Sequence, residues 1–275
     1  MSQSAVSISM QGKSSNWVRY CSRKAVLPFL LVIAFLISAC GSEAPAALAA
    51  VEVEPVEKTV DAEVTEAPPI VSTWVAEAKP VVENLVAYDT PNGTPIEFEF
   101  ASPNPYHFGG PLTLMVTEGT PDDAWVEVQL PIRPNGQTGW IDSSLYTFTQ
   151  TQVRAEVDLS ERSVIVYDGN EIIAETEAVI GTPQTPTPVG TFSITAKRRN
   201  PASESYLGPW ALALSAFSEV YDTFDGGIPV IAIHGTTRPE LVGGAHSNGC
   251  LRIPNEIVTL LAENVPLGAP VHISA

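Results

Sequence analysis

The sequence has little cysteine and little positive charge, and both shortages restrict what the protein can be. Three cysteines occur in 275 residues, and Cys250 is the only one after residue 40, so that part of the chain cannot form an internal disulfide. Lysine and arginine number 14 against 31 aspartates and glutamates, which gives a formal net charge of −17. Because nucleic-acid binding needs a basic surface, no nucleic-acid partner is expected. Paired Cys-x-x-Cys and His-Glu-x-x-His signatures are also absent, so neither a metal site nor a cofactor is predicted.

Long apolar runs are scarce as well, and the most prominent one lies near the start of the chain. Residues 25–38 (AVLPFLLVIAFLIS) follow several basic residues and end at small ones, which is typical of a secretory signal and too short for a comfortable membrane span. The tetrad Ile37-Ser38-Ala39-Cys40 resembles a bacterial lipobox. This resemblance implies that residues 1–39 are a lipoprotein signal peptide and that Cys40 becomes lipidated. The alternative is an ordinary signal peptide with a chance cysteine.

The composition then changes from a polar tether to short apolar runs. Residues 40–80 are rich in Ala, Pro, Val and Glu and poor in aromatics, which predicts a disordered acidic tether. Residues 81–148 contain alternating segments such as WVEVQL and turn signals such as RPNG, which predict about five short strands in a small β-barrel. The segment LPIRPNGQTGWI resembles the SH3-like modules that precede catalytic domains in bacterial wall enzymes. Trp125 and Trp140 are expected in the core of this module.

A second folded unit is predicted over residues 152–274. Alternating apolar residues flank Asp168-Gly169, a dipeptide suited to a hairpin turn, and the apolar strand IPVIAIHG ends on His234. Apolar residues at helical spacing follow in PNEIVTLLAENV, and APVHIS supplies a last strand. These patterns predict a mostly β sandwich or barrel with one or two short helices and with its functional residues at strand ends.

The surroundings of Cys250 indicate a reactive thiol. Its segment, HSNGCLRIPN, is a polar, glycine-containing turn that leads toward the predicted helix. Glycine lets main-chain N–H groups approach a reacting carbonyl and stabilise the oxyanion that forms. A helix N-terminus after the turn is expected to lower the thiol pKa. We therefore interpret Cys250 as a nucleophile and not as an inert core residue.

A nucleophilic thiol needs a base, and the chain offers four histidines. His234 ends an apolar strand and precedes Gly-Thr-Thr, so its main chain is rigid while its ring can face an open site, as a general base requires. No acidic residue neighbours it, so the group that orients its ring is remote or is a main-chain carbonyl. His107 is expected in a loop of the first module. A zinc site from His234, His246, Cys250 and His272 and a papain-like order with His272 as the base are the alternatives.

Several motifs together resemble a known catalytic domain. The run IHGT, followed sixteen residues after its histidine by the cysteine of SNGCLR, occurs with TPTPVGTF and RRNP upstream and LGAPVHI at the end. Residues 152–274 thereby resemble the L,D-transpeptidase catalytic domain of the YkuD type, a β-sandwich. The resemblance implies that Cys250 attacks a peptide carbonyl, that His234 takes the thiol proton, and that the carbonyl of Gly235 orients the imidazole.

One position departs from the pattern of that family. The family run Ser-His-Gly-Cys is Ser247-Asn248-Gly249-Cys250 in this chain. Because the base of the family is the earlier histidine, we expect Asn248 to alter hydrogen bonding near the oxyanion without abolishing the chemistry. Ser247 and Gly249 are the other residues expected at the oxyanion and substrate site.

The resemblance also implies a substrate and a location. The chain is expected to be a membrane-anchored lipoprotein outside the cytoplasm that cleaves the bond to D-Ala in a tetrapeptide stem of peptidoglycan and transfers the acyl group to an amine of a neighbouring stem. Arg252 is a candidate for holding a stem carboxylate, and the basic residues 197–199 for facing the anionic stem. The module at 81–148 is expected to be dispensable for acylation. Alternatives are a carboxypeptidase that uses water and a decayed wall-binding lipoprotein.

Overall fold

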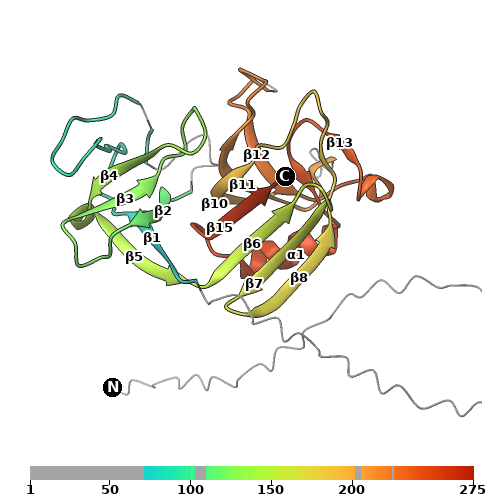
Figure 1. The fold of residues 1–275 in the computed structure, drawn as a ribbon, viewed down its shortest axis with the longest axis horizontal. Helices are drawn as coiled ribbons and strands as arrows, with labels where there is room; N and C mark the ends of the chain where they lie inside the picture. The colour runs from blue at the N-terminus through green and yellow to red at the C-terminus, as the bar shows by residue number, and fades with distance from the viewer. Residues whose placement is uncertain (1–70, 99, 103–109, 202–205, 225) are drawn as a thin grey trace, which may run out of the picture. The chain divides into compact units, whose positions relative to one another are not determined.

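The computed structural model describes residues 71–98, 100–102, 110–201, 206–224 and 226–275. The predicted signal peptide, Cys40, most of the predicted tether and His107 lie outside the described residues. The described chain consists mainly of β-strands with one α-helix, as Figure 1 shows, so the prediction of a mostly β protein is confirmed. Within these ranges, no helix is both long and apolar enough to cross a membrane.

The first sheet has five antiparallel strands. In the spatial order β4-β3-β2-β1-β5, they are β1 (Thr73–Ala78), β2 (Thr113–Glu118), β3 (Trp125–Gln129), β4 (Thr138–Asp142) and β5 (Tyr146–Thr151), with the short 3-10 helix η2 (Ser143–Leu145) before β5. Because side chains alternate along a strand, Val126, Val128 and Ile141 all point to one side of this sheet, where they are buried in its core. Trp125 and Trp140, expected in that core, are instead half-buried.

Strand β1 lies before residue 81, where the sequence predicted the module to begin. It pairs with β2 on one side and with β5 on the other, so it is an inner strand of the sheet. Its sequence, TWVAEA, lies among the Ala, Pro and Glu residues that predicted a tether. Cross-strand pairing with partners far along the chain thus orders a segment whose local composition gave no strand signal.

The second sheet has eight strands and carries the residues of functional interest. In the spatial order β14-β12-β11-β10-β15-β6-β7-β8, its strands are β6 (Val153–Asp158), β7 (Ser163–Asp168), β8 (Glu171–Glu177), β10 (Gly190–Arg199), β11 (Trp210–Phe217), β12 (Val230–His234), β14 (Leu251–Arg252) and β15 (Pro270–Ser274). A small two-stranded sheet joins β9 (Ile180–Gly181) to β13 (Ala245–Ser247), and a 3-10 helix η4 covers Pro239–Leu241.

The large sheet curls around the single helix, α1 (Asn255–Asn264). Helix α1 packs against β11 and β12 near one end of the strand order and also against β8 at the other end (Figure 1). Val179, just after β8, exchanges main-chain hydrogen bonds of 2.8 and 3.0 Å with Arg252 of β14. The two ends of the sheet therefore meet, and they enclose a core of aliphatic side chains from the strands and α1.

Local signals in this half of the chain are confirmed. Strands β7 and β8 form the hairpin expected at Asp168-Gly169, where Gly169 has a φ of 58°. The helix predicted in PNEIVTLLAENV is α1.

Lys197, expected with its basic neighbours to face the substrate, instead donates from Nζ to the carbonyls of Ala262 and Val265, each at 2.9 Å. Its charge therefore stabilises the C-terminal end of α1.

Candidate active site

The pairing of β12 with β14 brings the predicted base and nucleophile to one face of the sheet. The two strands are parallel, with Ile233 opposite Leu251 and His234 opposite Arg252. Ile233 and Leu251 are fully buried in the core that contains α1. Because side chains alternate along a strand, His234 and Arg252 lie on the other face, and Cys250, two residues before Arg252, lies beside them.

His234 is held in a neutral form that can accept a proton. It is buried, and its Nδ1 is 2.7 Å from the carbonyl oxygen of Gly235. A carbonyl only accepts hydrogen bonds, so Nδ1 carries the proton and Nε2 has the free lone pair. The pKa of His234 is lowered to about 4: burial is the largest cause and the charge of Arg252 also lowers it, while the carbonyls of Gly235 and Leu207 raise it. The ring is thus an unprotonated base at neutral pH.

The turn after His234 leaves little room for a side chain at Gly235. A Cβ on Gly235 would lie 2.3 Å from Oδ1 of Asn255 and 2.9 Å from Cα of Gly208. Asn255 also accepts the main-chain N–H of Thr236 at 2.8 Å. Asn255 and Gly208 therefore hold the carbonyl of Gly235 in place. Sequence reasoning missed both residues, although an asparagine directly after the proline at the helix start was a usable signal for Asn255.

The thiol of Cys250 is free, half-buried and protonated at rest. Burial raises its pKa, while the main-chain N–H of Ala232 and the charge of Arg252 lower it, and burial is the largest of these effects. The expectation that a helix N-terminus would lower the thiol pKa is therefore wrong in its net direction. Helix α1 begins at Asn255, after β14 has intervened.

The turn that carries Cys250 is closed by its own serine. Ser247 is buried; its hydroxyl accepts the N–H of Gly249 at 3.1 Å and donates to the carbonyl of Cys250 at 2.6 Å. Gly249 has a φ of 113°, and a Cβ there would lie 2.9 Å from Cδ1 of Ile231. Ser247 and Gly249 thus shape the turn, and the hydroxyl of Ser247 is used within it.

Two threonines from the TPTP run support this turn from outside. Thr185 donates to the carbonyl of Ser247 at 3.0 Å, and the buried Thr187 donates to the carbonyl of Gly249 at 2.9 Å. The carbonyl and the N–H of one trans peptide point in opposite directions. The bond from Thr187 therefore directs the N–H of Cys250 away from Thr187, which makes this N–H a candidate oxyanion donor. Sequence reasoning used the TPTP run only as part of the resemblance.

Arg252 and Asn248 flank the thiol in different ways. Arg252 is half-buried, and its Nε has no hydrogen-bond partner within the described part of the chain. Its charge acts on both His234 and Cys250, which places it near both groups. Asn248 is exposed, and its Oδ1 accepts a long hydrogen bond of 3.5 Å from the hydroxyl of Tyr221.

The two other histidines that the structure describes, His246 and His272, are both exposed. His272 is exposed on β15, where Nδ1 lies 3.0 Å from the hydroxyl of Thr191. Strand β15 is four positions from β14 in the sheet, which is about 19 Å along the sheet at about 4.8 Å per strand. His246 is exposed on β13. The papain-like pairing of Cys250 with His272 is therefore not formed, and no group of three potential metal ligands occurs among the residues that the structure describes.

Comparisons with known proteins agree with the motifs of the second unit. Residues 152–273 match the family model described as the YkuD L,D-transpeptidase catalytic domain. YkuD of Bacillus licheniformis, which carries the name of an L,D-transpeptidase, is 33% identical over 121 residues, a match that covers 44% of this chain and 65% of that protein. YkuD of Bacillus subtilis, named in the same way, is 32% identical over 118 residues, covering 43% and 63%. The chain thus spans just under two thirds of these relatives.

Solved structures give weaker likenesses. An L,D-transpeptidase from Mycobacterium tuberculosis H37Rv aligns with 73% of this chain and 80% of its own, at 16% identity and a TM-score of 0.39. The sequence match is therefore the stronger of the two kinds of similarity. Residues 152–273, which contain Cys250 and His234, match the YkuD-type L,D-transpeptidase catalytic domain.

Proposed function

We propose that this protein is a peptidoglycan L,D-transpeptidase in which Cys250 is the nucleophile and His234 the general base. One observation carries the proposal: a neutral histidine, oriented through Nδ1 by the carbonyl of Gly235, lies on the same sheet face as a free thiol. The match of residues 152–273 to the transpeptidase domain supplies the substrate class, a stem peptide.

Acylation follows from the resting state of the two groups. The thiol is protonated and the imidazole is neutral, so Nε2 of His234 takes the proton as the sulfur attacks the carbonyl that precedes D-Ala. The oxyanion that forms is stabilised by the N–H of Cys250, which the bond between Thr187 and Gly249 directs away from the supporting turn. The imidazolium then returns its proton to the leaving amine, D-Ala departs, and a thioester remains on Cys250.

Transfer of the acyl group reverses these roles. An amine of a neighbouring stem attacks the thioester, His234 accepts a proton from that amine, and the thiolate leaves and is then reprotonated. Arg252 acts on both groups: its positive charge stabilises the thiolate of Cys250 and disfavours the imidazolium of His234, so the base is neutral before each step. The same guanidinium is suited to a stem carboxylate, since its Nε has no partner within the described residues.

Export and anchoring complete the proposal. The chain acts outside the cytoplasm, held to a membrane through a lipid on Cys40 and separated from it by the acidic tether. The motif Ile37-Ser38-Ala39-Cys40 after the apolar run supports this location. Metabolic labelling with a fatty-acid analogue tests it: the label should disappear in Cys40→Ala, and a retained label would exclude this anchor.

The activity is tested by product analysis with the full-length protein. Incubation with a tetrapeptide stem and an acceptor stem should release D-Ala and produce a cross-linked dimer, and both products should be missing with Cys250→Ala. Release of D-Ala with only the hydrolysed tripeptide would replace the transferase by a carboxypeptidase. Absence of any D-Ala from a folded wild-type protein would support the decayed wall-binding alternative.

A further inference from the structure

An exposed loop connects β11 to β12 and borders the proposed site. This β11–β12 loop, residues 218–229, leads directly into the strand that ends on His234. Glu219 and Val220 are exposed, as are most of its described residues. The hydroxyl of Tyr221 donates to Oδ1 of Asn248, two residues before Cys250. The position of this loop therefore decides whether the hydroxyl of Tyr221 reaches Asn248 near the thiol.

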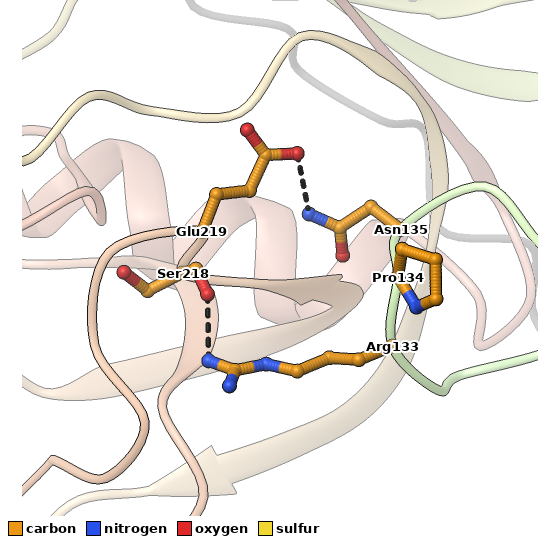
Figure 2. A pocket seen from close by; sticks show the side chains of 5 residues that line it. All are labelled: Arg133, Pro134, Asn135, Ser218 and Glu219. Carbon is orange, nitrogen blue, oxygen red and sulfur yellow. Dashed lines mark hydrogen bonds between the residues drawn. The ribbon is translucent and has the colours of Figure 1, made fainter.

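The turn between β3 and β4 reaches this loop from the first sheet. Nη2 of Arg133 donates to the carbonyl of Ser218 at 2.6 Å and also to the carbonyl of Tyr221 (Figure 2 shows the bond to Ser218). Nη1 forms an ion pair of 3.7 Å with the exposed Asp222. Because exposed ion pairs contribute little, the two carbonyl bonds are the important contacts of Arg133.

Asn135, in the same turn, holds the start of the loop. Its side-chain amide donates to the carbonyl of Phe217 at 2.8 Å and accepts the N–H of Phe217 at 2.9 Å. This pair of hydrogen bonds resembles the pair that two opposite residues exchange in an antiparallel sheet. The amide also donates to Oε1 of Glu219 at 3.3 Å, as Figure 2 shows. Asn135 thus fixes the point where β11 ends and the loop begins.

The base of the hairpin is anchored more deeply. Gln129 and Ser215 are both buried, and the hydroxyl of Ser215 donates to Oε1 of Gln129 at 2.6 Å. Gln129 also donates to the carbonyl of Thr191, and Ser215 accepts the N–H of Ser193 at 3.0 Å. Since buried polar groups are costly to leave without partners, these bonds fix the hairpin on β10 and β11.

The contact at the tip of the hairpin is polar and loosely packed. A cavity of about 450 Å³ lies beside these contacts and is lined by Arg133, Pro134, Asn135, Ser218 and Glu219 (Figure 2). Shortening Arg133 or Asn135 therefore removes hydrogen bonds to the loop without removing core packing.

We infer that Arg133 and Asn135 are positioning residues for the proposed acyl transfer, through which the first sheet holds Tyr221 beside Asn248. The inference rests on the proposed function, because it concerns the edge of the same site. It also reverses the expectation that the first module is dispensable for acylation. The hairpin supplies the contacts that position an otherwise exposed loop, so the rate depends on two residues that precede Cys250 by 115 and 117 positions.

The test compares variants of the full-length protein. Arg133→Ala and Asn135→Ala should each reduce the rate of acylation by a tetrapeptide stem by about tenfold, the effect of losing one or two hydrogen bonds. Chymotrypsin should cut both variants after Tyr221 or Phe224 faster than it cuts the wild type. Arg133→Lys should restore part of the rate. Tyr221→Phe should reduce the rate in the wild type but add little to Arg133→Ala, because a loop released by Arg133→Ala no longer holds the Tyr221 hydroxyl on Asn248.

A matched control separates positioning from a general loss of stability. Arg154 donates to the carbonyl of Gly169 at 2.6 Å, a bond of the same chemistry on β6. Arg154→Ala should leave both the acylation rate and the cleavage of the loop unchanged. Wild-type acylation rates in Arg133→Ala and Asn135→Ala would overturn the inference. If the wild type itself fails to acylate, the proposed function falls, while the proteolysis alone still decides whether the hairpin holds the loop.

Discussion

The proposed site has two borders that are held in different ways. The turn from Ser247 to Cys250 is supported by buried hydroxyl groups of its own domain, those of Ser247 and Thr187. The β11–β12 loop is exposed and is held by Arg133 and Asn135 of the first sheet. The proposed nucleophile is thus positioned by hydrogen bonds of buried groups, while the other border of the site depends on polar contacts in water, which are easier to exchange.

The largest loss of acylation rate is expected when His234, the proposed base beside the turn from Ser247 to Cys250, is removed. His234→Ala should lower the acylation rate by about 10² to 10⁴, the usual contribution of a positioned base. His246→Ala and His272→Ala should change it much less, because both side chains are exposed and lie outside the site. Rates of acyl-enzyme formation, measured by intact mass under identical conditions, rank the three variants. Equal damage from His272→Ala in a folded protein would contradict the assignment.

A substitution at Thr187 tests how the turn from Ser247 to Cys250 is supported. Thr187→Val leaves the buried carbonyl of Gly249 and the N–H of Gly181 without partners, so it should cost about 1–3 kcal/mol of unfolding free energy. Acylation should fall about tenfold as the N–H of Cys250 loses its direction. Thr185→Val, at a half-buried position, is the matched control and should cost less. Chemical denaturation and acylation rates measure both effects; equal stability of the two variants would remove the distinction.

The buried histidine also makes stability depend on pH. The pKa of His234 falls from 6.5 to about 4 on folding, so the unfolded chain binds this proton at a higher pH than the native one. His234 therefore does not lower the free energy of unfolding above pH 6.5. Below that pH it lowers this free energy progressively until the pH reaches about 4. The full loss is about 3 kcal/mol at most. Urea denaturation between pH 7 and 4 should show this loss in the wild type and not in His234→Gln.

Within the turn from Ser247 to Cys250, Asn248 should tolerate substitution best. Asn248→His introduces the residue found in the family run, and the side chain is exposed at the edge of the site. Because the base is His234, and because an imidazole nitrogen at position 248 can accept the hydrogen bond from Tyr221 in place of the amide oxygen, acylation should stay within about threefold of the wild-type rate or rise modestly. A loss of a hundredfold or more would mean that Asn248 takes part in the chemistry and does not merely border it.

Local patterns predicted the reacting groups but not their supports. His234 and Cys250 could be proposed because each stands at the end of a short, recognisable segment, and the hairpin at Gly169 and helix α1 follow from local periodicity. The bond from Thr187 to Gly249 joins residues 62 positions apart, and the one from Asn135 to Phe217 joins residues 82 apart. Such contacts depend on which strands become neighbours, which local periodicity does not encode.

Two further misses have the same origin. Strand β1 is ordered by its pairing with β2 and β5, although its composition is that of a tether. The pKa of Cys250 is raised because the folded chain buries the thiol, whereas the sequence suggested only the nearby helix start. Burial and pairing are properties of the assembled fold, so they appear only when the sheets are in place. The SH3-like character of the first module and the lipid on Cys40 stay predictions.

The most direct test of the account is the location of the covalent bond. After exposure of the full-length protein to a carbapenem or a tetrapeptide stem, intact-mass spectrometry should show a single added acyl group. Peptide mapping should place this group on Cys250, the one cysteine after residue 40. Cys250→Ala should show no adduct with either reagent, because the covalent step needs the thiol. An adduct that persists in Cys250→Ala, or a folded wild-type protein that forms none, would contradict the central claim.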